Sequence, residues 1–231
     1  MTKKNILTAA VSLSLVACLS IGATLAYFTD KTDVQTNTFK AGNVDVTLID
    51  QFDKTTTPKG SYVFDNHGVQ TGIEYTNVVP GDVLDKDVSL MVRNGSANAH
   101  LAILVTVDNT KNINSDDVYD MVDEAVLRLN NDAMWQEGKT VTTTDGVTGK
   151  LYVYNPNYTG ADWTKGVPAN TVVNLFSDIE IPAEWGNAYA NAEFDIKVRG
   201  YAIQAEHLDV TDLENAITNN ESDIEFEQYG D

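Results

Sequence analysis

One stretch, residues 22–48, joins two patterns that usually lie apart in a protein chain. Its first part ends an export signal, because Thr24 and Ala26 supply the small residues that a signal peptidase requires at positions −3 and −1. Its second part alternates apolar and polar side chains, which predicts a first core strand over residues 43–50. Cleavage after Ala26 leaves a mature chain that begins with a short, strand-prone arm. The apolar residues of this arm are Tyr27, Phe28, Val34 and Phe39.

The first 26 residues have the composition of a secretory signal peptide. Lys3 and Lys4 form its positive end, and residues 6–21 form its apolar core. An uncleaved membrane anchor is one alternative, although the apolar run is short for a spanning helix. A lipoprotein is another, because Cys18 follows a lipobox-like Leu-Val-Ala. Cys18 is the only cysteine, so a mature chain that starts at Tyr27 has no disulfide and no thiolate chemistry.

Two motifs in this region carry a family resemblance. Residues 27–30 read Tyr-Phe-Thr-Asp, and residues 38–46 read Thr-Phe-Lys-Ala-Gly-Asn-Val-Asp-Val. Together they resemble the N-terminus of the TasA/camelysin family of secreted proteins of Gram-positive bacteria. The resemblance implies cleavage by a SipW-type signal peptidase and a jelly-roll-like β-sandwich. It also implies a location in the extracellular matrix or at the cell surface, and assembly with itself and with other matrix proteins into biofilm fibres.

The charge of the chain limits its partners. The sequence has 34 acidic and 15 basic residues, a net charge of −19. Loss of the two lysines in residues 1–26 takes the mature chain to −21. Nucleic acid is disfavoured as a partner, because binding phosphates requires a basic surface. Copies of such a chain also repel one another, so any assembly depends on specific contacts and is helped by salt.

The rest of the mature chain predicts an all-β fold, a jelly-roll-like antiparallel sandwich with one inserted helix. Apolar residues recur at helical spacing over residues 115–130, and Ser115 is the expected N-cap. A change of alternation at Gly200 suggests a β-bulge. The remaining segments are assigned as follows: strands at 62–64, 69–77, 83–93, 99–107, 150–155, 171–181 and 193–205, a Thr/Gly turn at 139–149, and a short helix at 210–217. The predicted domains are a signal peptide (1–26), the sandwich (27–205) and an acidic tail (206–231), whose last part we expect to be mobile.

Candidate chemistry is sparse. No H-E-x-x-H zinc motif occurs, and His67, His100 and His207 stand far apart in sequence. A zinc site that the fold assembles from His and carboxylates remains an alternative, as does loose calcium binding in the loop 108–117. Three tryptophans are candidate platforms for sugar rings: Trp135, Trp163 and Trp185.

The expected function is therefore a secreted structural subunit of fibres, with no cofactor, no bound metal and no enzyme activity. The arm predicts the mechanism: it adds as a β-strand to the sheet edge of the next copy, which gives head-to-tail polymers without a membrane partner after cleavage. Two alternatives stand beside it, a camelysin-like surface metalloprotease and a monomeric adhesin or glycan-binding module.

Overall fold

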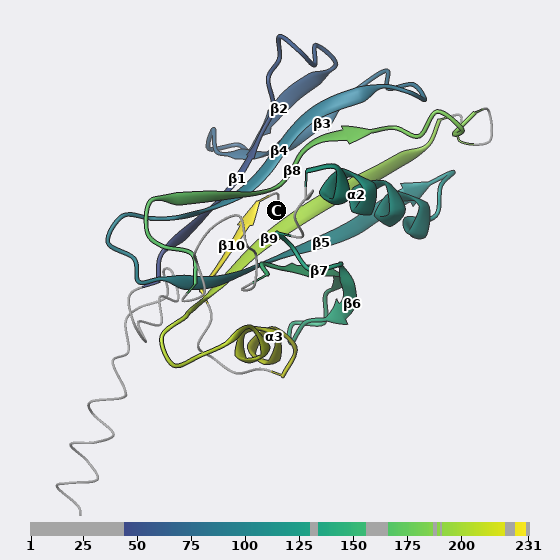
Figure 1. Cartoon of the computed structure of the whole chain (residues 1–231). Coiled ribbons are helices and arrows are strands. Elements are labelled where there is room, and N and C mark those ends of the chain that lie inside the picture. The colour runs from purple at the N-terminus through teal and green to yellow at the C-terminus, as the bar shows by residue number, and fades with distance from the viewer. Residues whose placement is uncertain are drawn as a thin grey trace, which may run out of the picture. The chain divides into compact units, whose positions relative to one another are not determined.

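The computed structural model describes residues 44–129, 134–155, 166–186, 189 and 191–219, and the backbone of 225–229. The chain divides into two compact units, residues 1–37 and 38–231, and every described residue belongs to the second. This unit is built from ten strands and two helices among the described residues (Figure 1).

The strands form two larger antiparallel sheets and one hairpin. The three-stranded sheet has the order β1 (Val46–Gln51), β4 (Val83–Val92), β8 (Thr171–Glu180). The five-stranded sheet has the order β10 (Glu225–Tyr229), β9 (Glu193–Gln204), β5 (Ala99–Lys111), β7 (Thr148–Val153), β6 (Lys139–Thr142). The hairpin pairs β2 (Gly60–Phe64) with β3 (Gln70–Tyr75).

The main hydrophobic core lies between the two larger sheets. Alternation places Val46 and Leu48 of β1 and Leu90 of β4 on its inner side, opposite Leu101 and Ile103 of β5. All five side chains are at most 4% exposed. The predicted antiparallel β-sandwich is confirmed.

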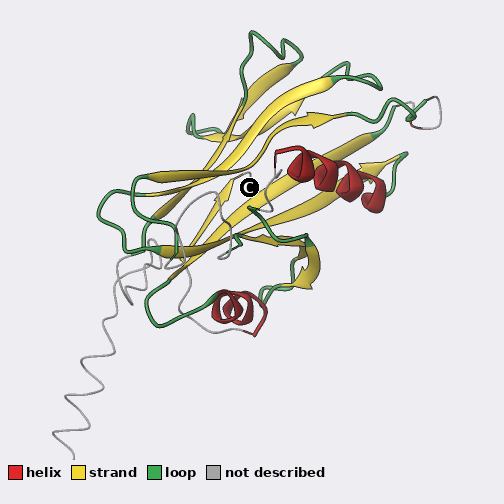
Figure 2. Ribbon diagram, in the orientation of Figure 1, coloured by secondary structure: helices red, strands yellow, loops and turns green. Residues whose placement is uncertain are grey.

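Helix α2 (Ser115–Leu129) lies against β8 and β5 and fills one side of the sandwich (Figure 2). Its apolar stripe enters the main core, as the helical spacing predicts. The predicted N-cap is wrong by one residue. The side-chain oxygen of Asn114 accepts a hydrogen bond from the backbone N–H of Asp117 at 2.8 Å, so Asn114 rather than Ser115 satisfies the free end of the helix.

The second helix, α3 (Val210–Asn219), covers the outer face of the five-stranded sheet (Figure 2). Its Leu213 and Ile217 pack with Tyr201 and Ile203 of β9 in a second, smaller core. Strand β9 is therefore covered on both faces, and this burial explains the change of pattern at Gly200. The β5–β9 register runs without a shift past this residue, so the predicted bulge is wrong.

Two segments differ from the sequence expectation. The predicted turn at 139–149 contains β6, which pairs with β7 at the edge of the sheet. The end of the expected mobile tail contains β10, whose backbone pairs with β9. Both strands are short and polar, with the sequences Lys-Thr-Val-Thr and Glu-Phe-Glu-Gln-Tyr. Pairing with an existing sheet edge stabilises these short segments, in which Thr, Val, Phe and Tyr favour a strand.

Candidate functional site

The residues that carry the proposed assembly precede the described part of the chain. Ala26 and Tyr27 at the predicted cleavage site lie outside the described residues, as do Phe28, Val34 and Phe39 of the arm. The structure does fix the point where the arm joins the sandwich. Val44 packs against the main core, and the carbonyl of Asp45 accepts a hydrogen bond from the N–H of Arg93 at 2.8 Å.

This junction lies at one end of the sandwich. Asp45 N–H donates to Ser96 Oγ at 3.1 Å, so the root of the arm is held by the turn that joins β4 to β5. From there β1 runs antiparallel to β4, from Val46 opposite Val92 to Gln51 opposite Asp87. The arm therefore meets the body at the end where β1 begins, and the features below lie where β1 ends.

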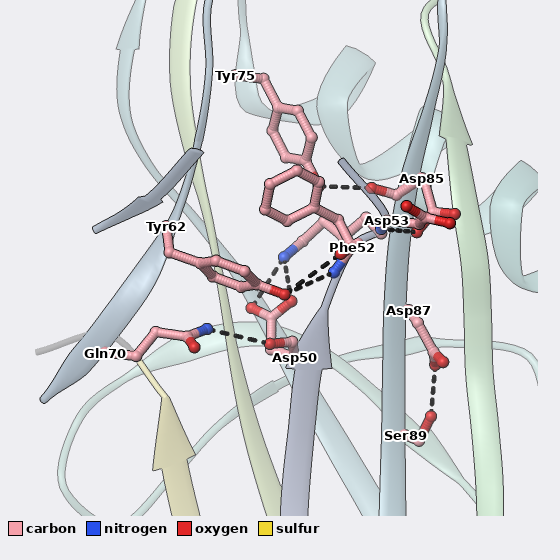
Figure 3. Close-up of polar contacts among 10 residues, drawn as sticks. Asp50, Phe52, Asp53, Tyr62, Gln70, Tyr75, Asp85, Asp87 and Ser89 are labelled. Carbon is pink, nitrogen blue, oxygen red and sulfur yellow. Dashed lines mark hydrogen bonds and ion pairs between the residues drawn. The ribbon is translucent and has the colours of Figure 1, made fainter. Parts of the chain in front are cut away.

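The β2–β3 hairpin packs over that other end through a cluster of aromatic rings. The ring of Phe52 lies 4.7 Å from Tyr62 and 5.9 Å from Tyr75, measured between centroids (Figure 3). Tyr62 donates its hydroxyl hydrogen to the carbonyl of Phe52 at 3.2 Å, and Tyr75 donates to the carbonyl of Asp85 at 2.6 Å. Burial, together with the Asp50 and Asp85 carboxylates, raises the pKa of Tyr75, so this hydroxyl stays a neutral donor.

A buried ion pair lies beside the hairpin. Lys86 Nζ donates to both carboxylate oxygens of Asp50, at 2.6 and 2.8 Å, and the two side chains are 7% and 6% exposed. Both residues occupy inward positions in strands whose neighbouring inward residues are apolar. Gln70 of β3 donates to the carbonyl of Asp50 at 3.3 Å and links the hairpin to the pair. Such a pair adds little net stability, because desolvating two charges is costly.

An open hollow of about 440 Å³ lies at the same end, lined by Gln51, Phe52, Asp53, Lys54, Asp85, Asp87 and Ser177. Its carboxylates already have protein donors. Asp53 accepts from both the hydroxyl and the N–H of Thr55, which lowers the pKa of Asp53. Asp87 accepts from Ser89 at 2.5 Å and from Asn174 at 2.8 Å. Within the described ranges, no group of three or more His, Cys, Asp or Glu side chains is arranged to hold a metal ion.

The three histidines lie in different settings. His67 is exposed in the turn between β2 and β3, with Nδ1 3.6 Å from Asp65. His100 is buried in β5, where Nε2 lies 3.0 Å from the carbonyl of Leu208. His207 is exposed in the connection before α3. Each has its own local partner.

The other candidate side chains have structural contacts. In the loop 108–117, Asp108 pairs with Lys197 at 3.4 Å, and Asp117 bonds to Asn114. Trp135 is 2% exposed and donates to the carbonyl of Asn174 at 2.7 Å. Trp185 stacks on Tyr189 with centroids 4.9 Å apart and is 8% exposed. Neither tryptophan presents an open face to a sugar, and Trp163 lies outside the described residues.

The edge where β9 meets β10 is a feature that sequence analysis missed. β10 pairs antiparallel with β9, from Glu225 opposite Ala202 to Tyr229 opposite Val198. It also lies next to β1, the edge strand of the other sheet (Figure 1). The only hint in the sequence is the alternation of apolar and polar residues over 224–229, Ile-Glu-Phe-Glu-Gln-Tyr. Because the segment is acidic, it also fits a solvated tail.

Comparison with known proteins gives one match. The profile of the camelysin metallo-endopeptidase family matches residues 2–148, more than half of the chain. No curated protein and no solved structure matches. In the part of the chain that the structure describes, no helix has both the length and the apolar character needed to cross a membrane. The chain belongs to the camelysin family, which also includes TasA, as its N-terminal motifs predict.

Proposed function

We propose that this chain is an exported structural subunit that assembles head-to-tail into extracellular fibres. The observation that carries the proposal is that the residues described from Val44 onward form both sheets and the core between them. The first of these strands begins at Val46, and we propose that the arm is additional to this sandwich. A strand-prone segment of this kind can extend the sheet of another copy, with backbone hydrogen bonds providing affinity and alternate side chains providing register.

The geometry favours an open polymer. The arm joins the sandwich at the β4–β5 turn, where Asp45 bonds to Arg93 and Ser96. An arm and the sheet edge that receives it are different surfaces, so each contact leaves a free arm at one end and a free edge at the other. Repetition of such a heterologous contact gives filaments rather than closed dimers.

Export is the second part of the proposal. We propose that a SipW-type peptidase cuts after Ala26 and that the mature chain leaves the membrane and joins a matrix with other proteins. Ala26→Asp is expected to block cleavage and to trap a membrane-associated precursor, because the −1 position accepts only small residues. A mature chain that begins at a lipidated Cys18 would contradict this part.

Electron microscopy of the purified mature protein, with N-terminal sequencing of the same sample, tests the proposal as a whole. The expected result is filaments made of chains that begin at Tyr27. A chain that begins at Tyr27 and stays monomeric at every concentration and salt level would overturn fibre assembly. Binding of that monomer to a glycan array would favour an adhesin.

The family description favours a second candidate, a metallo-endopeptidase. We propose that the chain is not itself a peptidase. Each of the three histidines has a different local partner, and the sequence has no H-E-x-x-H motif. Metal analysis and protein digestion with and without a chelator discriminate the two. Stoichiometric zinc, lost with peptidase activity in His67→Ala, His100→Ala or His207→Ala, would establish the enzyme.

A further inference from the structure

Strand β9 has a long edge of which β10 covers only a part. β9 spans Glu193–Gln204 and pairs with β5 over most of that length. On its other edge, β10 pairs only with Val198–Ala202. Residues 193–197 thus have no strand partner on that edge among the described residues. Unpaired backbone groups along a sheet edge are a template for another strand.

β10 occupies the edge of the five-stranded sheet, hydrogen-bonded to β9 and next to β1, and we call this position the slot. β1 is the edge strand of the three-stranded sheet, and both β9 and β10 lie next to it (Figure 1). The opposite side of the sandwich is filled by α2, whose buried residues belong to the main core. One side is therefore closed by a fifteen-residue helix and the other by a five-residue strand.

β10 can leave this slot at little cost to the rest of the fold. It is the last of the described elements, and residues 220–224 join it to α3. α3 is fixed independently, because Leu213 and Ile217 are buried against the outer face of the five-stranded sheet. We therefore expect α3 and the other strand pairs to stay in place when β10 leaves.

The negative charge of the C-terminal segment also disfavours β10 as a permanent occupant of the slot. Residues 220–231 contain five acids and no lysine or arginine, in a chain whose net charge is already −19. The arm, Tyr27 to Phe39, with the four residues that join it to the described chain, contains Asp30 and Asp33 but also Lys31 and Lys40, so the net charge of residues 27–43 is zero. These seventeen residues are also enough to pair with the whole of β9, whereas β10 pairs with five. A neutral, longer strand gains more hydrogen bonds and meets less repulsion.

We propose that the slot between β9 and β1 is the acceptor for the N-terminal arm of a second copy, and that β10 is an intramolecular strand that holds the slot until the arm displaces it. This inference rests on the proposed fibre function. It adds the surface that accepts the arm and the strand that controls access to that surface. The apparent affinity for the arm is reduced by the fraction of molecules in which β10 is seated.

The first test removes β10. A mature chain that ends at Asn219 is compared with the full mature chain by circular dichroism and by sedimentation of fibres over time. Since a minor open state is typically populated at 10% or less, we expect the shortened chain to assemble about tenfold faster or more. A peptide of residues 27–43 should bind the shortened chain more tightly by a similar factor. The control is Glu221→Gln with Asp223→Asn, which reduces charge outside β10 and should change assembly much less.

The second test locks β10 in place and does not depend on the shortened chain folding. Gln228 and Arg199 are register partners across the β9–β10 pair, and the mature chain has no cysteine of its own. A disulfide between Gln228→Cys and Arg199→Cys should stop assembly when oxidised and permit it when reduced. Each single-cysteine variant should assemble in both conditions.

The outcomes separate this inference from the proposed function. A full chain that assembles at the same rate as the folded shortened chain, or a locked chain that still polymerises, would overturn the role of β10 alone. A shortened chain that folds but no longer assembles would show that β10 is needed in the fibre, which also contradicts the inference. If neither chain assembles and neither binds the arm peptide, the fibre function itself fails.

Discussion

Lys86 Nζ lies within hydrogen-bond distance of both carboxylate oxygens of Asp50, and both side chains are more than nine-tenths buried. Removal of one partner leaves the other as an uncompensated buried charge. We expect Lys86→Met to lower the free energy of unfolding by about 3–5 kcal/mol, measured by urea denaturation of the mature chain. The double variant Lys86→Met with Asp50→Leu should recover most of that loss. A loss below about 1 kcal/mol in the single variant would show that the site is hydrated.

The second prediction concerns Gly200 of β9. A Cβ atom at this position would overlap Leu90 Cδ2, which is fully buried in the facing sheet. We expect Gly200→Ala to lower the free energy of unfolding by about 1–3 kcal/mol through overpacking. Gly72→Ala is the matched control, since nothing lies within 4 Å of the added carbon there, and it should change stability by less than about 0.5 kcal/mol. Equal losses in the two variants would contradict the close approach of the sheets.

The third prediction concerns the loss of folding stability at low pH. The ion pair with Lys59 and the hydrogen bond from Val79 N–H hold the pKa of Asp82 below its ordinary value of 3.8. The unfolded state therefore binds this proton at higher pH than the folded state. The contribution of Asp82 to stability is present above about pH 3.8 and is lost as the pH falls through the folded-state pKa.

Asp82→Asn should accordingly reduce the difference in urea midpoint between neutral and acidic solution, compared with the unsubstituted chain. Asp120→Asn, at an exposed position of α2, is the control and should leave that difference unchanged. An unchanged difference in both variants would show that other carboxylates govern acid unfolding.

The fourth prediction concerns the arm. Removal of residues 27–38 should leave a folded monomer that does not extend filaments, because the described sheets begin only at Val46. Phe39→Asp should reduce the yield of sedimentable fibre more than Lys31→Ala, since a charge buried in an apolar groove costs several kcal/mol and an exposed lysine costs little. Circular dichroism reports the fold of each variant. Filaments of normal length from the shortened chain would rule out strand donation by this arm, and unfolding would make the arm a strand of its own sandwich.

Most of the fold can be predicted from the sequence, because in most elements the spacing of the apolar residues matches the face that is buried. Val46 and Leu48 alternate into the core as expected, and the helical spacing around Met121 and Val122 places α2 correctly. The pattern fails where one strand is buried on both faces. In β9, Tyr201 and Ile203 face α3 while Val198 and Ala202 face the other sheet, so alternation of polarity disappears without any bulge.

The remaining misses have a common physical cause. β6 and β10 are formed by pairing with the edges of β7 and β9, and the short sequences of Lys139–Thr142 and Glu225–Tyr229 do not specify which edge each one joins. The same is true of the acceptor slot, since its two walls, β1 and β9, come from opposite ends of the chain. The cleavage site and the arm, by contrast, were predicted from local motifs, and they stay predictions because they precede the described residues.

The ladder between β5 and β9 has a consequence for how the protein is made. It pairs Ala99 with Gln204, which are 105 positions apart (204 minus 99), so the centre of the larger sheet cannot form until nearly the whole sequence has been synthesised. Pairings of such long range fold slowly, because loop closure costs entropy before any contact compensates it. We predict that chains ending before Glu193 leave β5 open to proteolysis. If residues 1–26 act as the predicted signal, this delay gives the export machinery time to engage the chain while it is still unfolded.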